Sequence, residues 1–183
     1  MLLGKQHFYD ARDERLALES YMSCASCHNQ GGEDGRVWDF TGVGEGLRNT
    51  IPLNGRAGTG HGALHWTANF DEVQDFENDI RAHFGGDGFM RDSLFLGGTV
   101  AQPLGDPKAG LSPELDALAA YLASLDGVGR SPYRQPDGGL SAAGLAGRTL
   151  FQSLGCATCH AGPTFRDGLL HDVGTLGPGS GQA

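Results

Sequence analysis

The sequence predicts an all-α, loop-rich protein with two domains, and three observations support this expectation. Hydrophobic residues recur every three or four positions in three segments, as they do on one face of an α-helix. Glycine accounts for 31 of the 183 residues and only 39% are hydrophobic, so long loops and a modest core are expected. A short cysteine motif occurs once near each end of the chain, which indicates one copy for each domain.

The repeated motif is Cys-x-x-Cys-His, at residues 24–28 and 156–160, and it contains all four cysteines of the chain. Two thiols three positions apart can each add to a vinyl group of one haem, and the following imidazole can then ligate the iron. The sequence therefore predicts two covalently bound haems c. They would be held by Cys24, Cys27 and His28, and by Cys156, Cys159 and His160.

Two other kinds of site use paired cysteines. A four-cysteine zinc site usually has its pairs within about 20 residues of each other, whereas these motifs begin at residues 24 and 156. A redox-active dithiol is usually found in a fold where strands alternate with helices. No run of β-branched or aromatic residues in this sequence predicts such strands. Both alternatives therefore rank below haem attachment.

The charge and hydropathy of the chain restrict its partners and its location. The formal net charge of -9 argues against nucleic-acid binding. No segment has the roughly 18–20 consecutive apolar residues of a transmembrane helix. Because haem c is attached outside the bacterial cytoplasm, we expect a periplasmic or extracellular protein whose leader sequence precedes Met1.

Helices are expected over residues 69–84, 112–126 and 141–154. Asn69 would cap the first of these, and Glu72 would complete a capping box. Ser112 and Ser141 would cap the other two helices, with Pro113 at the first helical position of the second. The glycine-rich residues 31–62 are expected to form a long loop around the first haem.

The stretch rich in proline and glycine after the second helix is the best candidate for a linker. We therefore expect a first haem domain over residues 1–127, a linker over 128–139 and an incomplete second haem domain over 140–183. Gly147 costs about 1 kcal/mol within a helix, which makes sense if another helix crosses close to it, but no segment of this chain is expected to form that partner helix.

Several short segments resemble the bacterial di-haem cytochrome c peroxidase and MauG family. The similar segments are residues 4–12, 23–28, 34–35, 48–50, 65–66, 155–167 and 171–175. The resemblance implies cytochrome c-like domains, peroxide reduction at the first haem and electron delivery through the second. It also implies a small cytochrome or cupredoxin as redox partner, a homodimer, and a calcium ion near Asn49.

The ligand on the far side of each iron decides whether a haem binds substrate or only carries electrons. His61 and His65 are the candidates above the first haem, and the alternative for both is a surface or propionate-side position. For the second haem, Met90 or a histidine could reach across from the first domain, another chain could donate a ligand, or the iron could be five-coordinate or water-ligated. His83 is expected to be a cation at a helix C-terminus.

The resemblance assigns Trp66 to electron relay between the haems, and the alternative is a core aromatic beside a haem. Gln74 matches a glutamine on the substrate side, but Phe84 stands where the family has a glutamate. The acid or base for breaking a peroxide bond is therefore not identified, with Glu72, Glu77 and Asp87 as substitutes.

These observations favour a di-haem oxidoreductase that reduces hydrogen peroxide, with Trp66, Gln74 and His65 as catalytic residues and His28, His160 and His61 as iron ligands. The alternative function is a non-catalytic electron-transfer module of a larger exported protein.

Overall fold

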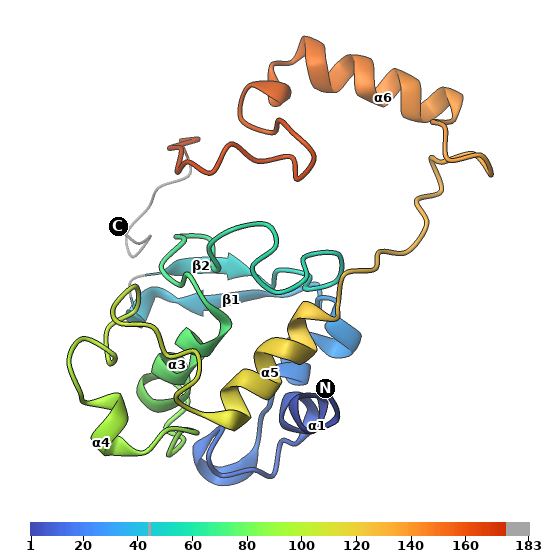
Figure 1. Cartoon of the computed structure of the whole chain (residues 1–183). Coiled ribbons are helices and arrows are strands. Elements are labelled where there is room, and N and C mark those ends of the chain that lie inside the picture. Colours follow the sequence, from blue (N-terminus) through green and yellow to red (C-terminus); the bar gives the residue numbers. More distant parts are fainter. Residues whose placement is uncertain (44, 175–183) are drawn as a thin grey trace. The chain divides into compact units, whose positions relative to one another are not determined.

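The computed structural model describes residues 1–43 and 45–174, which form two units (Figure 1). The first unit comprises Met1–Asp126 and the stretch that begins at Asp172, and the second comprises Gly127–His171. The expected second domain, 140–183, therefore extends past the described residues. No helix in the described ranges is long and apolar enough to cross a membrane.

The first unit contains short helices and one small sheet. Its elements are α1 (Leu2–Tyr9), α2 (Cys24–Cys27), β1 (Val37–Phe40), β2 (Gly46–Asn49), α3 (Phe76–Ala82), α4 (Asp92–Phe95) and α5 (Pro113–Ala123). The second unit contains α6 (Ala142–Ser153). Single 3₁₀ turns lie at Leu18–Ser20, Asn29–Gly31, Thr41–Val43, Val73–Asp75 and Cys156–Thr158.

The expectation of an all-α, cytochrome c-like fold is wrong, because the predicted loop over residues 31–62 contains a hairpin. Strands β1 and β2 pair antiparallel, with Val37 opposite Asn49 and Phe40 opposite Gly46. Each strand has only four residues, too few for the alternating pattern to stand out within a glycine-rich stretch.

Helices α1 and α5 pack against each other, and Gly4 allows their close approach (Figure 1). A Cβ atom on Gly4 would lie 1.8 Å from the carbonyl oxygen of Ala117. By contrast, apart from the neighbouring backbone of α6 itself, no described atom lies within 4 Å of the Cβ position of Gly147. No other described segment crosses α6 at Gly147, whereas α1 and α5 cross closely at Gly4.

The hydrophobic core of the first unit forms two clusters. One joins α3, α4 and the start of α5, and the other joins α1 to the rest of α5 and borders Cys24. Met90 is 5% exposed and belongs to the first cluster, where it packs as an ordinary core side chain.

A buried ion pair lies beside this core. The Nζ of Lys108 is 2.6 Å from Oδ1 of Asp75, and both side chains are almost fully buried. Lys108 also donates to the carbonyl oxygen of Gln102 at 3.2 Å. These partners offset part of the cost of removing the two charges from water.

Helix α3 begins later than its hydrophobic pattern predicts. Glu72 caps a 3₁₀ turn over Val73–Asp75, and the α-helix starts only at Phe76. Asp75 accepts the backbone N–H groups of Asp71 and Glu72, which supports this turn. The expected caps of the other two helices are confirmed: Ser112 Oγ accepts the N–H of Leu115, and Ser141 Oγ accepts that of Gly144.

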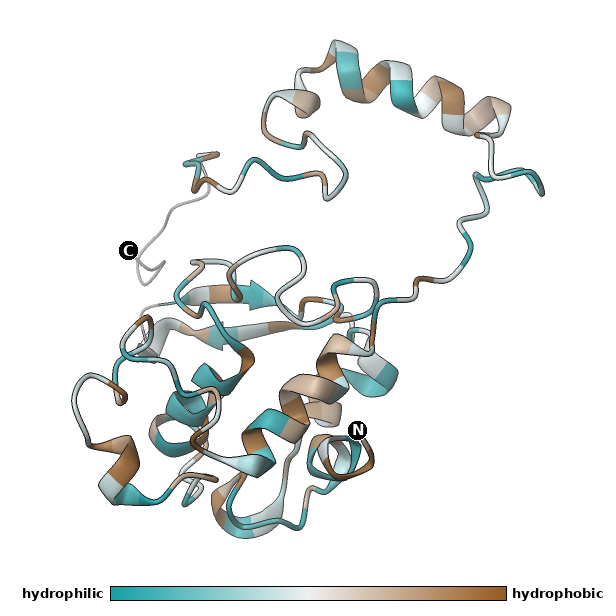
Figure 2. Cartoon of the chain, in the orientation of Figure 1, coloured by the Kyte–Doolittle hydropathy of each residue, from teal (hydrophilic) through white to brown (hydrophobic). Residues whose placement is uncertain are grey.

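The second unit buries little of its own apolar surface. Hydrophobic and hydrophilic residues alternate along α6 (Figure 2), and none of its residues is buried. Leu150 is 59% exposed and Leu154 is 75% exposed. Its internal contacts include Phe151, whose ring centroid lies 6.3 Å from that of His160 and 6.0 Å from that of Phe165.

Candidate functional site

The first Cys-x-x-Cys-His motif forms one wall of a mostly apolar cavity of about 280 Å³ in the first unit. Helix α2 carries both thiols, and its start is fixed by a reciprocal capping box between Ser23 and Ser26. The cavity is lined by Met22, Cys24, Cys27, His28, Trp38, Leu53, Leu64, His65, Trp66, Phe76, Asp79, Ile80, His83, Leu118 and Leu122, among others.

His28 follows α2 directly and lies in the same wall. Burial lowers the pKa of His28 below its ordinary value, and the nearby charge of His65 adds to this effect. Its Nδ1 atom is buried without a hydrogen-bond partner among the described residues. A neutral imidazole in an apolar wall is the form that ligates a metal.

Burial also affects the thiols of this wall. It raises the pKa of Cys24 to about 11, and it raises the pKa of Cys27 as well. Both side chains therefore remain neutral thiols at neutral pH. Apolar surroundings, two thiols and a neutral imidazole in one wall fit a covalently attached haem.

A second group of polar residues, His65, Asp79 and His83, also lines the cavity. The Nδ1 of His83 is 3.0 Å from Oδ1 of Asp79, and the Nε2 of His65 is 3.6 Å from Oδ2 of the same carboxylate. Burial raises the pKa of Asp79 above its ordinary value, and the two histidines partly oppose this shift. The carboxylate therefore lies between two imidazoles, an arrangement that can pass a proton.

The position of His65 is fixed by several contacts. Its Nδ1 lies 2.8 Å from Oδ1 of Asn69, and its ring packs against Phe70 and Phe76 with centroids 4.3 and 5.1 Å away. Its φ angle of 62° lies in the left-handed region, which is rarely populated by residues other than glycine. Such strain persists when the surrounding structure holds the residue in place.

Trp66 lies at the exposed side of this cavity. Its side chain lines the cavity and is nevertheless 56% exposed, and its Nε1 donates to the carbonyl oxygen of Asn49 at 3.0 Å. Trp66 is therefore not a core aromatic; it lies between the cavity and solvent.

Two other predicted site residues do not line the cavity. Gln74 is 7% exposed and its Nε2 donates to Oδ1 of Asp116 at 2.8 Å, so it links the turn before α3 to α5. His61 is half-buried and is absent from the cavity wall. Of the predicted catalytic residues and iron ligands, His28, His65 and Trp66 share the cavity.

Sequence reasoning missed Asp79 as a site residue and assigned His83 to a helix end. The signal was their spacing on α3, because Phe76, Asp79, Ile80 and His83 recur at positions i, i+3, i+4 and i+7 and all line the cavity. Two ionisable residues in an otherwise apolar helix face indicate a polar function for that face.

The second motif has different surroundings. Cys156 is exposed, and the Nδ1 of His160 lies 3.0 Å from the carbonyl oxygen of Phe165. An Nδ1–H that donates to a carbonyl leaves Nε2 free to ligate a metal, so the donor set again fits a haem.

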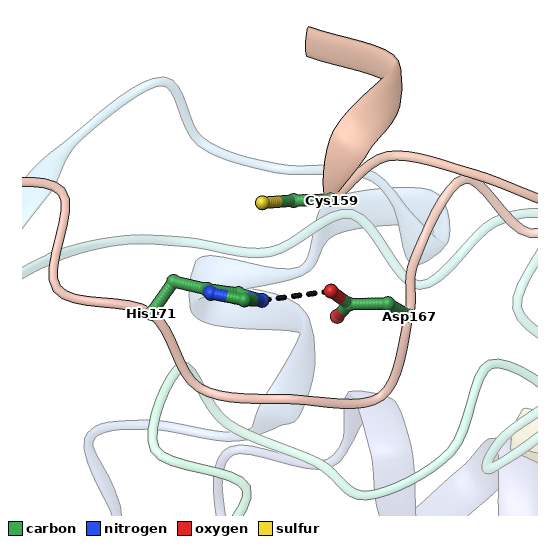
Figure 3. Close-up of side chains that lie close together, drawn as sticks. All are labelled: Cys159, Asp167 and His171. Atoms are coloured by element: carbon green, nitrogen blue, oxygen red, sulfur yellow. Dashed lines mark hydrogen bonds and ion pairs between the residues drawn. The ribbon is translucent and has the colours of Figure 1, made fainter. Parts of the chain in front are cut away.

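Cys159 lies beside two further polar residues, Asp167 and His171 (Figure 3). The ligand atoms of the three side chains lie within 4.8 Å of one another. The Nε2 of His171 is 2.7 Å from Oδ2 of Asp167. Hydrogen bonds from the N–H of Leu169 and from this histidine lower the pKa of Asp167.

No family model matches the chain, but comparisons with curated proteins and with solved structures each give a match. The chain is 31% identical over 180 residues to the gamma subunit of hydrazine synthase from Kuenenia stuttgartiensis, with 91% of this chain and 46% of the relative covered. It also matches a solved structure of Kuenenia stuttgartiensis hydrazine synthase under xenon at 27% identity and a TM-score of 0.62, over 95% of this chain and 55% of that one.

These matches correct the resemblance inferred from the sequence. The chain is similar to hydrazine synthase, and neither match is to a cytochrome c peroxidase or MauG protein. The segments that suggested that family are short, and two of them contain the Cys-x-x-Cys-His motifs, which are not specific to one family. The chain spans about half the length of the proteins it matches.

Proposed function

We propose that this chain carries two covalently attached haems and that the first supports proton-coupled redox chemistry on a small molecule. The observation that carries the proposal is the shared cavity, in which Cys24, Cys27 and His28 form one wall and His65, Asp79 and His83 also line the space. A bound haem supplies an iron that gains and loses electrons.

The residues of the first motif hold and orient this group. Cys24 and Cys27 attach it covalently, and the lowered pKa of His28 keeps its imidazole neutral and able to ligate iron. The apolar wall excludes water, which strengthens the electrostatic effect of the few polar groups nearby.

The His83–Asp79–His65 group moves protons between solvent and the cavity. The side chain of His83 is 33% exposed, whereas that of Asp79 is only 15% exposed. A proton taken from solvent by His83 can pass to Asp79 at 3.0 Å and then toward Nε2 of His65 at 3.6 Å. His65 keeps its orientation through Asn69.

The substrate we propose is a small molecule whose reduction or oxidation also requires protons. Because the similar gamma subunit belongs to a hydrazine synthase, nitrogen compounds of the size of hydrazine are the substrates we propose to test. Hydrogen peroxide, the substrate expected from the sequence, belongs to the same size class. Since haem c is attached outside the cytoplasm, the chain would act in the periplasm or outside the cell.

The test is Asp79→Asn, with Asp126→Asn as the matched control because Asp126 is exposed and lies outside the cavity wall. Loss of a general acid or base typically costs about 10²–10⁴-fold in rate. We expect a loss of that size with hydrogen peroxide or a small nitrogen compound for Asp79→Asn alone. Equal rates for both variants would contradict the proposed proton path.

A second candidate function is electron transfer without substrate chemistry, and the exposure of Trp66 favours it. Trp66 connects the cavity to solvent, so it offers a short route for electrons from a partner such as a small cytochrome or cupredoxin. Cyanide and nitric oxide distinguish the two functions. A perturbed spectrum at the first haem supports substrate binding, whereas two unresponsive haems support the electron carrier.

A further inference from the structure

The loop after the second motif folds back toward Cys159. The carbonyl oxygen of Phe165 lies 3.0 Å from Nδ1 of His160, and Oδ1 of Asp167 accepts the N–H of Leu169 at 3.0 Å. These contacts hold the loop so that Asp167 and His171 lie beside the thiol of Cys159 (Figure 3).

A thiolate, an imidazole and a carboxylate are the three side-chain ligands that zinc uses in proteins. Tetrahedral bonds of about 2.0–2.3 Å place the ligand atoms roughly 3.3–3.8 Å apart. The distances in this cluster bracket that range, from 2.7 Å between His171 and Asp167 to at most 4.8 Å across the group. Small side-chain movements therefore suffice for binding.

We propose that the haem-free chain binds one divalent transition metal ion, zinc in particular, through Cys159, Asp167 and His171. The ion takes the place of the proton between His171 and Asp167. The thiol of Cys159 loses its proton to solvent as the metal–sulfur bond forms, with no change in oxidation state. Water fills the fourth position of the tetrahedron.

The first motif has no comparable cluster of metal ligands among the described residues. Burial raises the pKa of Cys24 to about 11, which opposes formation of a thiolate there. The second motif also has the acidic and imidazole ligands that the first motif does not place beside its thiols among the described residues. Metal binding is therefore assigned to the second unit.

The proposed metal and a second haem would exclude each other, because both need the sulfur of Cys159. This consequence alone rests on the proposed haem function. A bound ion would keep Cys159 from forming a disulfide with Cys156 until haem is attached, since a metal-bound thiolate is held away from other partners.

A simpler metal site would use the motif itself, with Cys156, Cys159 and His160 as ligands. The two sites share Cys159 but differ in every other ligand. In the structure, the ligand atoms of Cys159, Asp167 and His171 lie together, and neither Cys156 nor His160 is part of this cluster. Substitutions can therefore separate the two sites.

The experiment uses the full haem-free chain carrying Cys24→Ala and Cys27→Ala, titrated with Co²⁺ as a spectroscopic probe and then with Zn²⁺. We expect one Co²⁺ per chain with thiolate-to-metal absorption, displaced by Zn²⁺. Cys159→Ser should abolish this absorption, and Asp167→Ala and His171→Ala should weaken binding by about tenfold or more. Circular dichroism of each variant checks that helix content is unchanged.

Cys156→Ser and His160→Ala are the matched controls, and both should bind Co²⁺ as the parent does. Loss of binding in either control would assign the metal to the motif itself and overturn the proposal, as would a parent chain without thiolate absorption. Haem attachment is measured separately on the exported chain, so failure of metal binding and failure of the proposed haem function give different results.

Discussion

The two Cys-x-x-Cys-His motifs have the same spacing but differ in their surroundings. The first lies in the wall of an apolar cavity bordered by the core of its unit. The second follows an α-helix with no buried residue, and its Cys156 is exposed. The first motif shares its cavity with the His65, Asp79 and His83 side chains, whereas the second lies beside an exposed Asp–His pair.

This difference shows that a motif determines which group can attach, while the surroundings determine what that group can do. A haem at the first motif would be enclosed and would have proton donors and acceptors beside it. A haem at the second motif would depend on exposed side chains such as Leu150 and Phe165 for apolar contact. This difference is why we propose substrate chemistry for the first unit.

The largest expected effect comes from deleting one haem at a time. Cys24→Ala with Cys27→Ala leaves the cavity of about 280 Å³ unfilled, which at roughly 24 cal/mol per Å³ costs up to about 7 kcal/mol of stability. Cys156→Ala with Cys159→Ala changes exposed or half-exposed positions, where substitutions usually cost about 0.5 kcal/mol or less. Denaturant unfolding measures both.

Mass spectrometry of the denatured holo-protein provides the control. The parent should retain two haem masses and each double variant one. A parent chain that releases its haem into acid acetone would contradict covalent attachment. Equal destabilisation by the two double variants would show that the second haem is as enclosed as the first.

The next effect concerns ion pairs, and one pair from each unit is compared. Lys108→Met leaves the Asp75 carboxylate buried without its partner, and such losses cost about 3–5 kcal/mol. The matched variant, His171→Gln, removes an exposed pair and should change stability far less. A similar cost for both variants would show that burial does not distinguish the two units.

Glycine substitutions in one helix of each unit should have opposite signs. Gly4→Ala places a Cβ 1.8 Å from the carbonyl oxygen of Ala117, so α1 and α5 must separate at a cost of about 1–3 kcal/mol. Gly147→Ala meets no described atom within 4 Å apart from the neighbouring backbone of α6 and should stabilise this helix by up to about 1 kcal/mol. Thermal unfolding and the helicity of α6 report the two effects.

If another segment contacted Gly147 closely in solution, Gly147→Ala would destabilise the chain instead of stabilising it. That outcome would mean that α6 packs against another helix in solution.

The sequence predicted helices where local signals were strong. Ser112 and Ser141 cap α5 and α6 as expected, because a hydroxyl before a hydrophobic period is a local feature. The hairpin was missed because four-residue strands have almost no period of their own. The crossing at Gly4 could not be predicted, since Ala117 is distant in sequence and only packing brings it close.

The cavity was predicted in part. His28 and His65 were identified from the motif and from the loop that precedes Trp66, and both line the cavity. Asp79 was missed because its role depends on two histidines, one of them contributed by another segment. Gln74 was selected by resemblance, but its side-chain amide donates a hydrogen bond to Asp116, and Gln74 does not line the cavity.

The smallest expected effect is a change in the pH dependence of stability, and it has opposite signs in the two units. Burial raises the pKa of Asp79 in the folded chain, so the folded state holds its proton more tightly than the unfolded state. The stability contributed by this group is present below the unfolded pKa of about 3.9 and is lost as pH rises toward the folded pKa. Asp79→Asn removes this loss.

The pKa of Asp167 is lowered, first by the N–H of Leu169 and then by His171. Its contribution is present above about pH 3.9 and is lost as pH falls through the folded pKa, so Asp167→Asn should remove a gain with rising pH.

Tryptophan fluorescence follows the first unit, since both tryptophans lie in it, and amide hydrogen exchange of α6 follows the second. Relative to each asparagine variant, the parent should lose stability with rising pH in the first unit and gain it in the second. Slopes of the same sign would show that Asp79 is solvated in the folded chain, and the carboxylate could not then hold a proton between His83 and His65.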